Sequence, residues 1–562
     1  MVYIRYSEIF YTRVFILLKK IILIFFLAMA KHLISVQDVY SNDPPKFILI
    51  HLDGVSGIYL EQELEKGNLP NLKAFFGHHG MIDHAITYFP SKTPTVISSL
   101  RFGDSIREAD LPGWQYVVDR IEGTTIKTVG TFLRMVFSTS RLSTTNILYG
   151  VPFFHWLAGP ALVNTADYLK DYNVVQFYWY NVDTHGHFFG EKEYLNALRD
   201  FDRQFGRLMK RLDDDVNVIL YSDHGMTFGQ GIEIGSIVED LLKDEVKLAA
   251  YPSVYLTEPE KADYYARKLR EETELDFTFF RLDNNTLKGY HKNGTIHFYK
   301  DYENQKISYR YEGEDVLGYN EKGYSGEYLS RYDWLKLTHA SEFPMAPVIL
   351  FHYMDNPNAG DIITLFDGFK YEQTGYASAG NHGGFVDKDM RALLLVRGAE
   401  LAKLYNRDYY WLPELFNDID NVDFEERPPR ERHIFSSRYD FRRNRTVTNI
   451  SLSPRYRINY GLTSYNSDFN QLSQFDSVDF WGKADLFRSY LVRFWIGTGF
   501  ELTPEEANPF LKLEYDIHIR KFVLRNSFAT HRPFELRVSY EALPWLAFET
   551  VNFTSIGLRF DF

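Results

Sequence analysis

The sequence predicts an α/β protein: a central, mostly parallel sheet with an inserted cap, followed by an antiparallel C-terminal β-domain. Three observations support this fold class. From about residue 45 to residue 250, short apolar runs alternate with amphipathic stretches, as a parallel sheet flanked by helices requires. Residues 251 to 375 show closely spaced hairpin signals instead. Residues 433 to 562 change again, to a period of two.

These changes predict the domain boundaries. We expect a signal peptide at 1–30 and a main domain at 45–412 whose cap insertion covers about 251–375. A polar stretch rich in Glu, Arg and Pro marks a linker at 413–432, and the β-rich domain follows at 433–562. A chain of 562 residues is too long for one ordinary core, which agrees with two or more domains.

Composition excludes some classes of protein. The chain has 62 basic and 75 acidic residues, a net charge of -13, which argues against a general or sequence-specific nucleic-acid binder. It has no cysteine, so neither a disulfide framework nor a thiolate metal site can form.

The first 30 residues have the pattern of a secretory signal peptide. Lys19 and Lys20 precede an apolar run over 21–26, and residues 28–30 read Ala-Met-Ala, a small-residue cleavage ending. The run is shorter than the roughly 20 residues that span a bilayer. A membrane anchor that also includes 14–18 is the alternative. We expect export to the periplasm or outer membrane of a Gram-negative-type envelope.

Six side chains that could bind metal lie beside apolar runs that predict buried strands. In open α/β sheets, the loops at the carboxyl ends of the strands meet at one edge, where ligands bind. We therefore expect the six to converge on a single site. They are Asp53 after the run at 47–50, Asp183 and His187 after 174–180, Asp223 and His224 after 218–221, and His382 before 391–396.

The chemistry of this set favours zinc. Three Asp and three His mix oxygen and nitrogen donors, and imidazole favours zinc over magnesium or calcium. Six ligands exceed one tetrahedral zinc, so two divalent ions are expected. Asp183 and His187 are four residues apart, on one side of a helical turn. Asp223 and His224 are adjacent and need a bent loop, which Gly225 permits.

Thr93 is the candidate nucleophile. It precedes an apolar helical run at 96–100, and the free N–H groups at a helix amino terminus favour phosphate. Metal coordination is one way to activate a threonine hydroxyl. A simple N-cap is the alternative role of Thr93, and Thr95 and Ser91 are competing hydroxyls.

The C-terminal region alternates apolar and polar side chains. Leu511, Leu513, Tyr515 and Ile517 alternate with polar residues, and the last strand ends in Phe562, like the terminal strand of bacterial outer-membrane barrels. About 130 residues allow roughly eight short strands, enough for the smallest transmembrane barrels. A soluble antiparallel sheet that packs its apolar face on the main domain is the alternative.

The order and context of these residues resemble the alkaline phosphatase superfamily, and within it the type I phosphodiesterase/nucleotide pyrophosphatase branch. The resemblance covers roughly residues 45 to 405, including the cap segments GEDVLGY and AGDIITLFDGF. It implies an alkaline-phosphatase-like three-layer core with a two-zinc site. One zinc would be held by Asp53, Thr93, Asp223 and His224, and the other by Asp183, His187 and His382.

The resemblance implies hydrolysis of a phosphodiester or pyrophosphate bond through a phosphothreonine on Thr93. The chain differs from the family pattern at one position that contacts substrate. The branch places an asparagine shortly after the nucleophile, where this chain has Trp114 and Gln115. Gln115 could replace that amide, and Asn146 is a more distant candidate. Arg101 and Arg134 are weaker candidates for a monoesterase-type arginine. Diester against monoester preference stays open.

The leading hypothesis is an exported two-zinc hydrolase acting on a small phosphate ester or nucleotide. One alternative keeps the site but changes the ester, to a phosphomonoester, a phosphonate or a sulfate. Another is an envelope-anchored binding protein with a non-catalytic metal site. Several aromatic side chains could stack on a base or ring, although we expect them in the core: Trp114, Tyr149, Phe153, Trp156 and Phe188.

Overall fold

The computed structural model describes residues 45–102, 111–119, 124–131, 155–169, 172–418, 432–455, 458–467, 476–488, 491–519, 522–543 and 546–561. The chain divides into two compact units. The core unit spans Lys46–Arg427, and the barrel unit includes Pro428–Phe562. The division falls within the predicted linker, 413–432. The predicted signal peptide lies outside the described residues.

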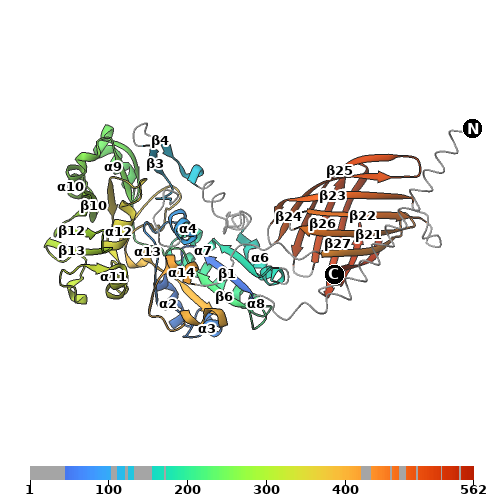
Figure 1. Ribbon diagram of the computed structural model, residues 1–562, viewed down its shortest axis with the longest axis horizontal. Coiled ribbons are helices and arrows are strands. Elements are labelled where there is room, and N and C mark those ends of the chain that lie inside the picture. The colour runs from blue at the N-terminus through green and yellow to red at the C-terminus, as the bar shows by residue number, and fades with distance from the viewer. Residues whose placement is uncertain are drawn as a thin grey trace, which may run out of the picture. The chain divides into compact units, whose positions relative to one another are not determined.

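A four-stranded sheet forms the centre of the core unit, in the order β18-β6-β1-β5. Figure 1 labels its strands β1 and β6. Strand β1 (Phe47–Leu52) pairs in parallel with β5 (Val174–Trp179) and β6 (Asn217–Tyr221), and β18 (Leu394–Arg397) runs antiparallel to β6. Every residue of β1 is buried, as in a sheet covered on both faces. The predicted mostly parallel sheet is confirmed.

Helices pack around this sheet. The amphipathic pattern at 195–212 forms α8 (Glu191–Met209), which buries Leu198, Phe201, Phe205 and Leu208 and ends before the predicted Leu212. α8 packs against α3, α6 and α7. The helices of this region are α2 (Gly57–Glu65), α3 (Pro70–Phe76), α4 (Thr93–Phe102), α6 (His155–Tyr168), α7 (Asn181–Phe189) and α9 (Ile234–Leu242).

The predicted insertion forms an eight-stranded antiparallel sheet, in the order β14-β13-β12-β11-β10-β15-β9-β8. The predicted turn at 292–294 joins β11 to β12, and the predicted helix from Ala262 is α10 (Ala262–Glu272). The strands are β8 (Val246–Ala250), β9 (Ser253–Leu256), β10 (Phe277–Asp283), β11 (Thr286–His291), β12 (Gly294–Asp301), β13 (Lys306–Gly313), β14 (Leu329–Ser330) and β15 (Ile362–Leu365).

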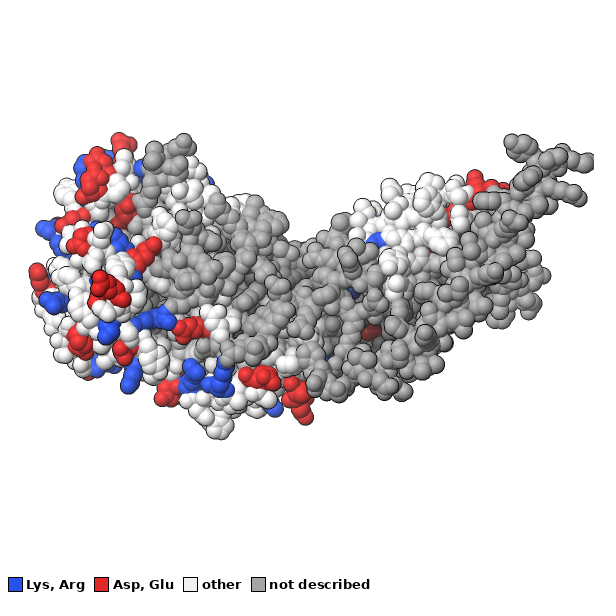
Figure 2. Space-filling view, in the orientation of Figure 1, with Lys and Arg blue, Asp and Glu red and all other residues white. Residues whose placement is uncertain are grey.

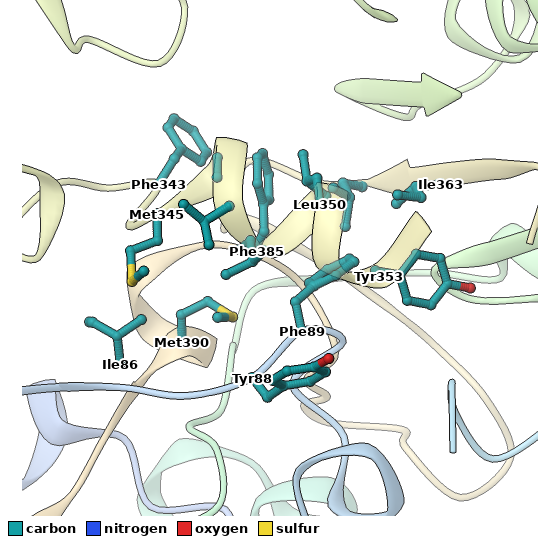
Figure 3. Close-up of a cluster of buried hydrophobic side chains, with 14 of the residues drawn as sticks. Ile86, Tyr88, Phe89, Phe343, Met345, Leu350, Tyr353, Ile363, Phe385 and Met390 are labelled. Atoms are coloured by element: carbon teal, nitrogen blue, oxygen red, sulfur yellow. The ribbon is translucent and has the colours of Figure 1, made fainter. Parts of the chain in front are cut away.

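The cap and the central sheet share one hydrophobic core (Figure 3). Leu350 and Tyr353 of α12 (Ala346–Met354) and Ile363 of β15 are buried in the same cluster as Phe89, which lies just before α4, and Met390. Burying one such large apolar side chain contributes about 1.5–3 kcal/mol. The cap is therefore part of the folded core of this unit.

Short elements complete the core unit. They are β2 (His84–Ile86) between β17 (Arg391–Ala392) and β19 (Tyr409–Trp411), β7 (Gln230–Ile232) paired with β16 (Lys370–Glu372), β3 (Tyr116–Asp119) paired with β4 (Thr124–Ile126), and the helices α11 (Arg331–Thr338), α13 (Asp387–Met390) and α14 (Leu415–Asp418). The core unit continues past residue 412, because Leu415 of α14 is fully buried.

The barrel unit is a closed barrel of ten antiparallel strands, β20 to β29 in sequence order, and β20 pairs with β29 to close it. The expected count of about eight strands is therefore wrong: ten strands form, and they close into a barrel. The strands are β20 (Arg432–Asp440), β21 (Arg445–Arg455), β22 (Ile458–Asn466), β23 (Ser477–Arg488), β24 (Val492–Leu502), β25 (Ala507–Ile519), β26 (Phe522–Ala529), β27 (Arg532–Leu543), β28 (Leu546–Val551) and β29 (Ser555–Asp561).

Among the described residues, no helix combines the length and the apolar character needed to cross a membrane.

Candidate metal centre

The six predicted ligands come together at the carboxyl edge of the central sheet. Asp53 follows β1, and the pair Asp223 and His224 follows β6. Asp183 and His187 lie one turn apart on α7, which begins directly after β5, and His382 lies in the loop between β16 and α13. All six side chains are almost completely buried. The sheet topology thus gathers ligands that are far apart in sequence.

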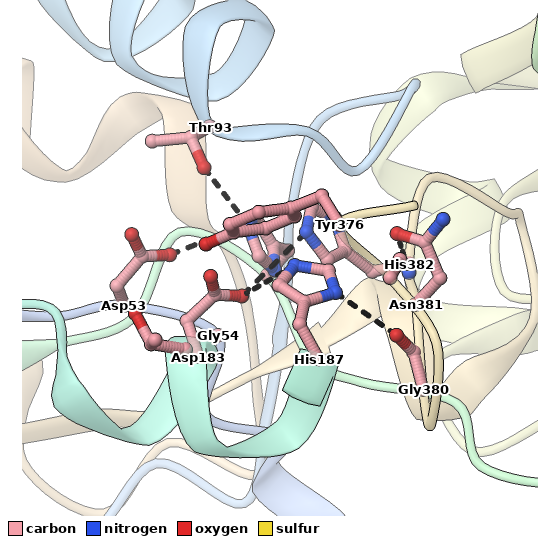
Figure 4. Close-up of polar contacts among 12 residues, drawn as sticks. Asp53, Gly54, Thr93, Asp183, His187, Tyr376, Gly380, Asn381 and His382 are labelled. Carbon is pink, nitrogen blue, oxygen red and sulfur yellow. Dashed lines mark hydrogen bonds and ion pairs between the residues drawn. The ribbon is translucent and has the colours of Figure 1, made fainter. Parts of the chain in front are cut away.

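Asp183, His187 and His382 form one group of donors (Figure 4). Asp183 Oδ1 lies 3.3 Å from His187 Nε2 and 3.6 Å from His382 Nε2. The other nitrogen of each ring contacts a backbone carbonyl: His187 Nδ1 is 2.9 Å from Gly380 O, and His382 Nδ1 is 2.7 Å from Ser91 O. Such a contact orients each ring and leaves Nε2 free to bind a metal.

Asp53, Asp223, His224 and Thr93 form a second group. His224 Nε2 lies 3.4 Å from Asp53 Oδ1, 3.3 Å from Asp223 Oδ2 and 3.2 Å from Thr93 Oγ1. Its Nδ1 again contacts a carbonyl, that of Gly225, at 2.9 Å. The two groups adjoin, because donor atoms of Asp53, Asp183 and His224 also lie within 4.8 Å of one another.

The buried carboxylates fit a pair of cations. Asp53 Oδ1, Asp183 Oδ1 and Asp223 Oδ2 are buried and make no hydrogen bond within the described structure. Burial raises the pKa of Asp53, and the charges of Asp223 and Asp183 raise it further. Such crowded carboxylates are costly without compensation. Two divalent ions, one at each group, would supply the missing charge and the missing partners.

Two residues of the site were not predicted. His51 Nε2 lies 3.2 Å from Asp223 Oδ1, and the Tyr178 hydroxyl donates a hydrogen bond to Asp53 Oδ2. His51 pairs directly with Tyr178 across β1 and β5, and with Tyr221 across β1 and β6. The available signal was that His51 lies two residues before Asp53, on the same face of its strand.

Thr93 is the first residue of α4, and it is the predicted hydroxyl that contacts the cluster. The competing hydroxyl of Ser91 donates to Gly384 O at 2.9 Å and accepts from Gly383 N at 3.0 Å. The hydroxyl of Thr95 is buried without a hydrogen bond. Lys92 donates to the carbonyl of Tyr251. These neighbours tie the segment to the His382 loop and the cap, and leave Thr93 Oγ1 at the cluster.

The residues that were considered for substrate contact have neighbours other than the metal ligands. Trp114 is half-buried and packs against a small cluster formed by Ile97, Leu111, Tyr116, Val117 and Tyr255, while Gln115 is exposed. No contact between described residues joins either one to the metal ligands. Asn146, Arg134, Tyr149 and Phe153 lie outside the described residues, and the side chain of Arg101 is not described. The prediction of a core position is wrong for Trp156, which is 73% exposed, and for Phe188, at 36%.

A group of aromatic side chains that was not predicted to contact substrate as a set lies beside the metal ligands. Tyr376, partly exposed, lies with its ring 4.8 Å from that of His187 and 4.9 Å from that of Phe188. Its hydroxyl is 2.6 Å from the hydroxyl of Tyr180. Figure 4 shows Tyr376 beside Asp183 and His187. Burial, and then the charge of Asp183, raise the pKa of Tyr376 above its ordinary value. The phenol therefore remains a hydrogen-bond donor at neutral pH.

Comparisons with known proteins give one family match and a set of similar solved structures. Residues 124–342 match the model of the family "Type I phosphodiesterase / nucleotide pyrophosphatase". No curated protein sequence matches. Similar solved structures include murine ectonucleotide pyrophosphatase / phosphodiesterase 5 (17% identity, 66% of this chain and 94% of that chain, TM-score 0.40). They also include its human counterpart (15%, 66% and 93%, 0.41) and alkaline phosphatase PafA (11%, 68% and 97%, 0.44).

The family match lies within the core unit, and its last part covers most of the cap. The metal-ligating cluster lies in the same unit, on the loops that follow the strands of the central sheet. Residues 124–342 of the core unit thus resemble the type I phosphodiesterase / nucleotide pyrophosphatase family, and the protein is a phosphoester hydrolase.

Proposed function

We propose that the protein is an exported two-zinc hydrolase that cleaves phosphodiester or pyrophosphate bonds of small molecules, nucleotides among them, through a phosphothreonine on Thr93. The main support is the contact of the Thr93 hydroxyl with one of two adjoining Asp/His groups. Asp53, Thr93, Asp223 and His224 would hold one ion, and Asp183, His187 and His382 the other. Zinc at these positions would lower the pKa of the hydroxyl and neutralise charge on the phosphoryl group.

The residues of the chain account for the remaining steps. Thr93 Oγ1 gives up its proton to solvent and forms a bond to phosphorus. The bond from phosphorus to the leaving group breaks, and the departing alkoxide or phosphate oxygen takes up a proton from solvent. The backbone N–H groups at the start of α4 face the phosphoryl oxygens. Water then attacks the phosphothreonine, which restores the Thr93 hydroxyl and releases a phosphomonoester or phosphate. The three carbonyl-bound imidazoles keep the ligands in place throughout.

A paired assay tests this function. Hydrolysis of a nitrophenyl nucleotide diester and of nitrophenyl phosphate is compared on one sample whose zinc content is measured. We expect two zinc ions per chain and preference for the diester. Preference for the monoester would make the protein a phosphomonoesterase on the same site. If zinc-loaded protein turned over neither substrate, the catalytic proposal would be wrong.

Threonine variants test the nucleophile. We expect Thr93→Ala to lower kcat by about a thousandfold or more while folding is retained, because the attacking atom is lost. Thr95→Ala is the matched control, since Thr95 lies two residues further along α4 and its hydroxyl makes no hydrogen bond. Activity kept in Thr93→Ala and lost in Thr95→Ala would show that the other hydroxyl is the nucleophile.

We also propose that the barrel unit inserts into the outer membrane of a Gram-negative-type envelope. Its outward positions are apolar, and the barrel atoms described in Figure 2 are mostly uncharged. Ten such side chains on β24 to β29 are each more than two-fifths exposed: Phe494, Ile496, Phe500, Leu511, Leu513, Phe522, Phe528, Phe534, Phe548 and Ile556. A polar inside and an apolar outside are the pattern of transmembrane barrels.

Membrane fractionation tests this insertion. We expect the full chain to stay in carbonate-washed membranes and to show heat-modifiable migration in detergent. Full solubility without detergent would contradict insertion.

A further inference from the structure

Charged side chains from separate strands meet inside the barrel. Arg532, at the start of β27, lies 3.2 Å from Asp479 Oδ1 on β23 and also pairs with Glu501 on β24. Strands β23 and β27 are four positions apart around the ten-stranded wall. Their side chains can touch only across the lumen. The guanidinium also lies 3.9 Å from the centre of the Tyr465 ring, on β22.

This cluster already holds a cation. Oxygen and nitrogen atoms of Asp479, Glu501 and His531 come as close together as metal ligands would. Arg532 supplies the positive charge among them, and it also donates to Ser477 Oγ at 2.9 Å. The group is therefore an ion-pair network within the lumen, in which Arg532 takes the place that a metal ion would have.

A second network lies further along the barrel. Glu514 on β25 pairs with Lys483 on β23, and it lies 3.0 Å from Lys512 and 3.1 Å from Arg525. Asp516 lies 2.6 Å from Arg525. The side chains of Lys483, Glu514 and Asp516 are 7%, 3% and 2% exposed. Water can therefore hardly reach charged groups that face the interior of the barrel.

A third set reaches the strands that close the barrel. Glu549 on β28 lies 3.5 Å from Arg559 on β29 and 3.8 Å from Arg537 on β27. Arg438 on β20 lies 3.7 Å from Glu535 on β27. The side chains of Glu549 and Arg438 are 1% and 6% exposed. Together the three sets fill the lumen from several sides, in a barrel small enough for side chains to do so.

We propose that the barrel is a sealed anchor, whose lumen is closed to ions and small solutes by these ion-pair networks. It holds the hydrolase at a membrane and does not conduct substrate or product. The proposal rests on the membrane insertion given under the proposed function. The physical reason is that an open path needs water-filled space. Here opposing walls are in contact through Arg532 and Asp479. Most of the paired carboxylates along the path are buried, namely Asp479, Glu514, Asp516 and Glu549.

Reconstitution of the full chain into liposomes tests the seal. Flotation and heat-modifiable migration first establish that the barrel has inserted, so a failure of insertion is distinguished from a closed lumen. The same vesicles hold a small fluorescent anion, and a large-pore porin serves as the positive control for leakage. We expect no release above protein-free vesicles, and no conductance steps in planar bilayers. Steady conductance by inserted wild-type protein would overturn the proposal.

Two matched variants test whether the volume of these side chains or their charge pairing closes the lumen. One carries Lys483→Ala, Glu514→Ala, Arg525→Ala and Arg532→Ala, and it is expected to release the anion because volume is lost from two networks. The other carries Lys483→Met, Glu514→Gln, Arg525→Met and Arg532→Met, which keep the bulk without the charge, and it is expected to stay closed. Anion release is compared only for a variant that floats with the liposomes and shows heat-modifiable migration, the two signs of insertion. Leakage from both variants would show that pairing, and not bulk, closes the lumen. If the alanine variant released no more anion than the wild type, these residues would not close the lumen. If neither variant folds, the wild-type release and conductance measurements still test the proposal.

Discussion

The imidazoles of His187, His224 and His382 share one arrangement. In each, Nδ1 lies within 2.9 Å of a backbone carbonyl, and Nε2 faces the carboxylates. A carbonyl only accepts, so each ring carries its proton on Nδ1 when neutral and presents a free electron pair at Nε2. Three rings set in this way in the same pocket are prepared to bind metal before any ion arrives.

The hydroxyl of Tyr178 should matter for metal affinity although it is not a ligand. It donates to Asp53 Oδ2, which leaves Asp53 Oδ1 directed at His224. We expect Tyr178→Phe to weaken metal binding about 10–100-fold, as loss of a group that orients a ligand does. Competition with a chelator on the purified protein measures this.

Tyr319→Phe is the control for this prediction. It also removes one buried hydroxyl, which donates to Phe343 O in the core shared with the cap. Metal affinity should be unchanged there. Equal loss in both variants would mean that general destabilisation, and not the orientation of Asp53, governs binding.

The sequence alone predicted the residues whose side chains commonly bind metal, but it did not predict the residues that orient them. Asp and His beside strand-like runs identified the six candidate ligands, because few other roles bring such groups to a sheet edge. His51 and Tyr178 were missed because each lies within an apolar strand run, where only the three-dimensional pairing of β1 with β5 shows their common face. Gln115 was chosen by its distance along the chain, which does not determine proximity in space.

The turn after β6 is the element on which the second donor group depends. Gly225 N donates to Asp389 O at 2.8 Å, and a Cβ atom built on Gly225 would lie 1.8 Å from Lys388 O. We expect Gly225→Ala to displace the turn and with it Asp223 and His224, and so to abolish metal binding. Gly375→Ala is the matched control, since its Cβ would meet nothing within 4 Å. Metal content and activity distinguish the two variants, and unchanged metal content in Gly225→Ala would contradict the argument.

Helix α12 carries a partly buried histidine, His352, that should make the core unit sensitive to acid. Burial, and then the charges of Lys300 and Arg331, lower the pKa of His352 to about 3, from an ordinary value of 6.5. The folded state therefore resists a proton that the unfolded state accepts below pH 6.5. Stability is fully present above that pH and falls as the pH drops toward 3, by about 3 kcal/mol between pH 7 and pH 4.

Substitution at this position tests the source of the acid sensitivity. We expect His352→Met to flatten the dependence of the urea midpoint on pH over this range, since the group that must stay neutral is gone. His78→Met, at an exposed position, should leave the dependence as it is in the wild type. An unchanged slope in His352→Met would assign the acid sensitivity to other groups.

Periodicity predicted the kinds of element better than their number. The three- and four-residue spacing gave α8, and the turn at 292–294 gave the hairpin of β11 and β12, because both signals are local. The period of two predicted strands throughout 433–562, but roughly eight of them where ten form. The number and closure depend on the pairing of β20 with β29, a contact between the two ends of the unit that no local pattern encodes.

At the scale of the whole molecule, the candidate metal centre and the charged networks of the barrel belong to different units. Every ligand of the metal centre lies between Lys46 and Arg427, and so does the hydrophobic core that the cap shares with the sheet. The barrel unit encloses its own charged networks. Neither set of interactions needs a residue of the other unit. The hydrolase should therefore keep its activity when the connection is cut.

A protease recognition sequence inserted between Arg427 and Pro428, at the division of the two units, tests this separation. In washed membranes carrying the full chain, cleavage should release the phosphoester hydrolase activity into the supernatant with kcat/KM unchanged, because the metal centre is complete within the released unit. The barrel should stay in the pellet with its heat-modifiable migration, because its outward face is apolar. The same membranes without protease control for simple shedding. Activity that disappears on cleavage would mean that the barrel completes the active site, and activity that stays in the pellet would mean that the core unit binds the membrane by itself.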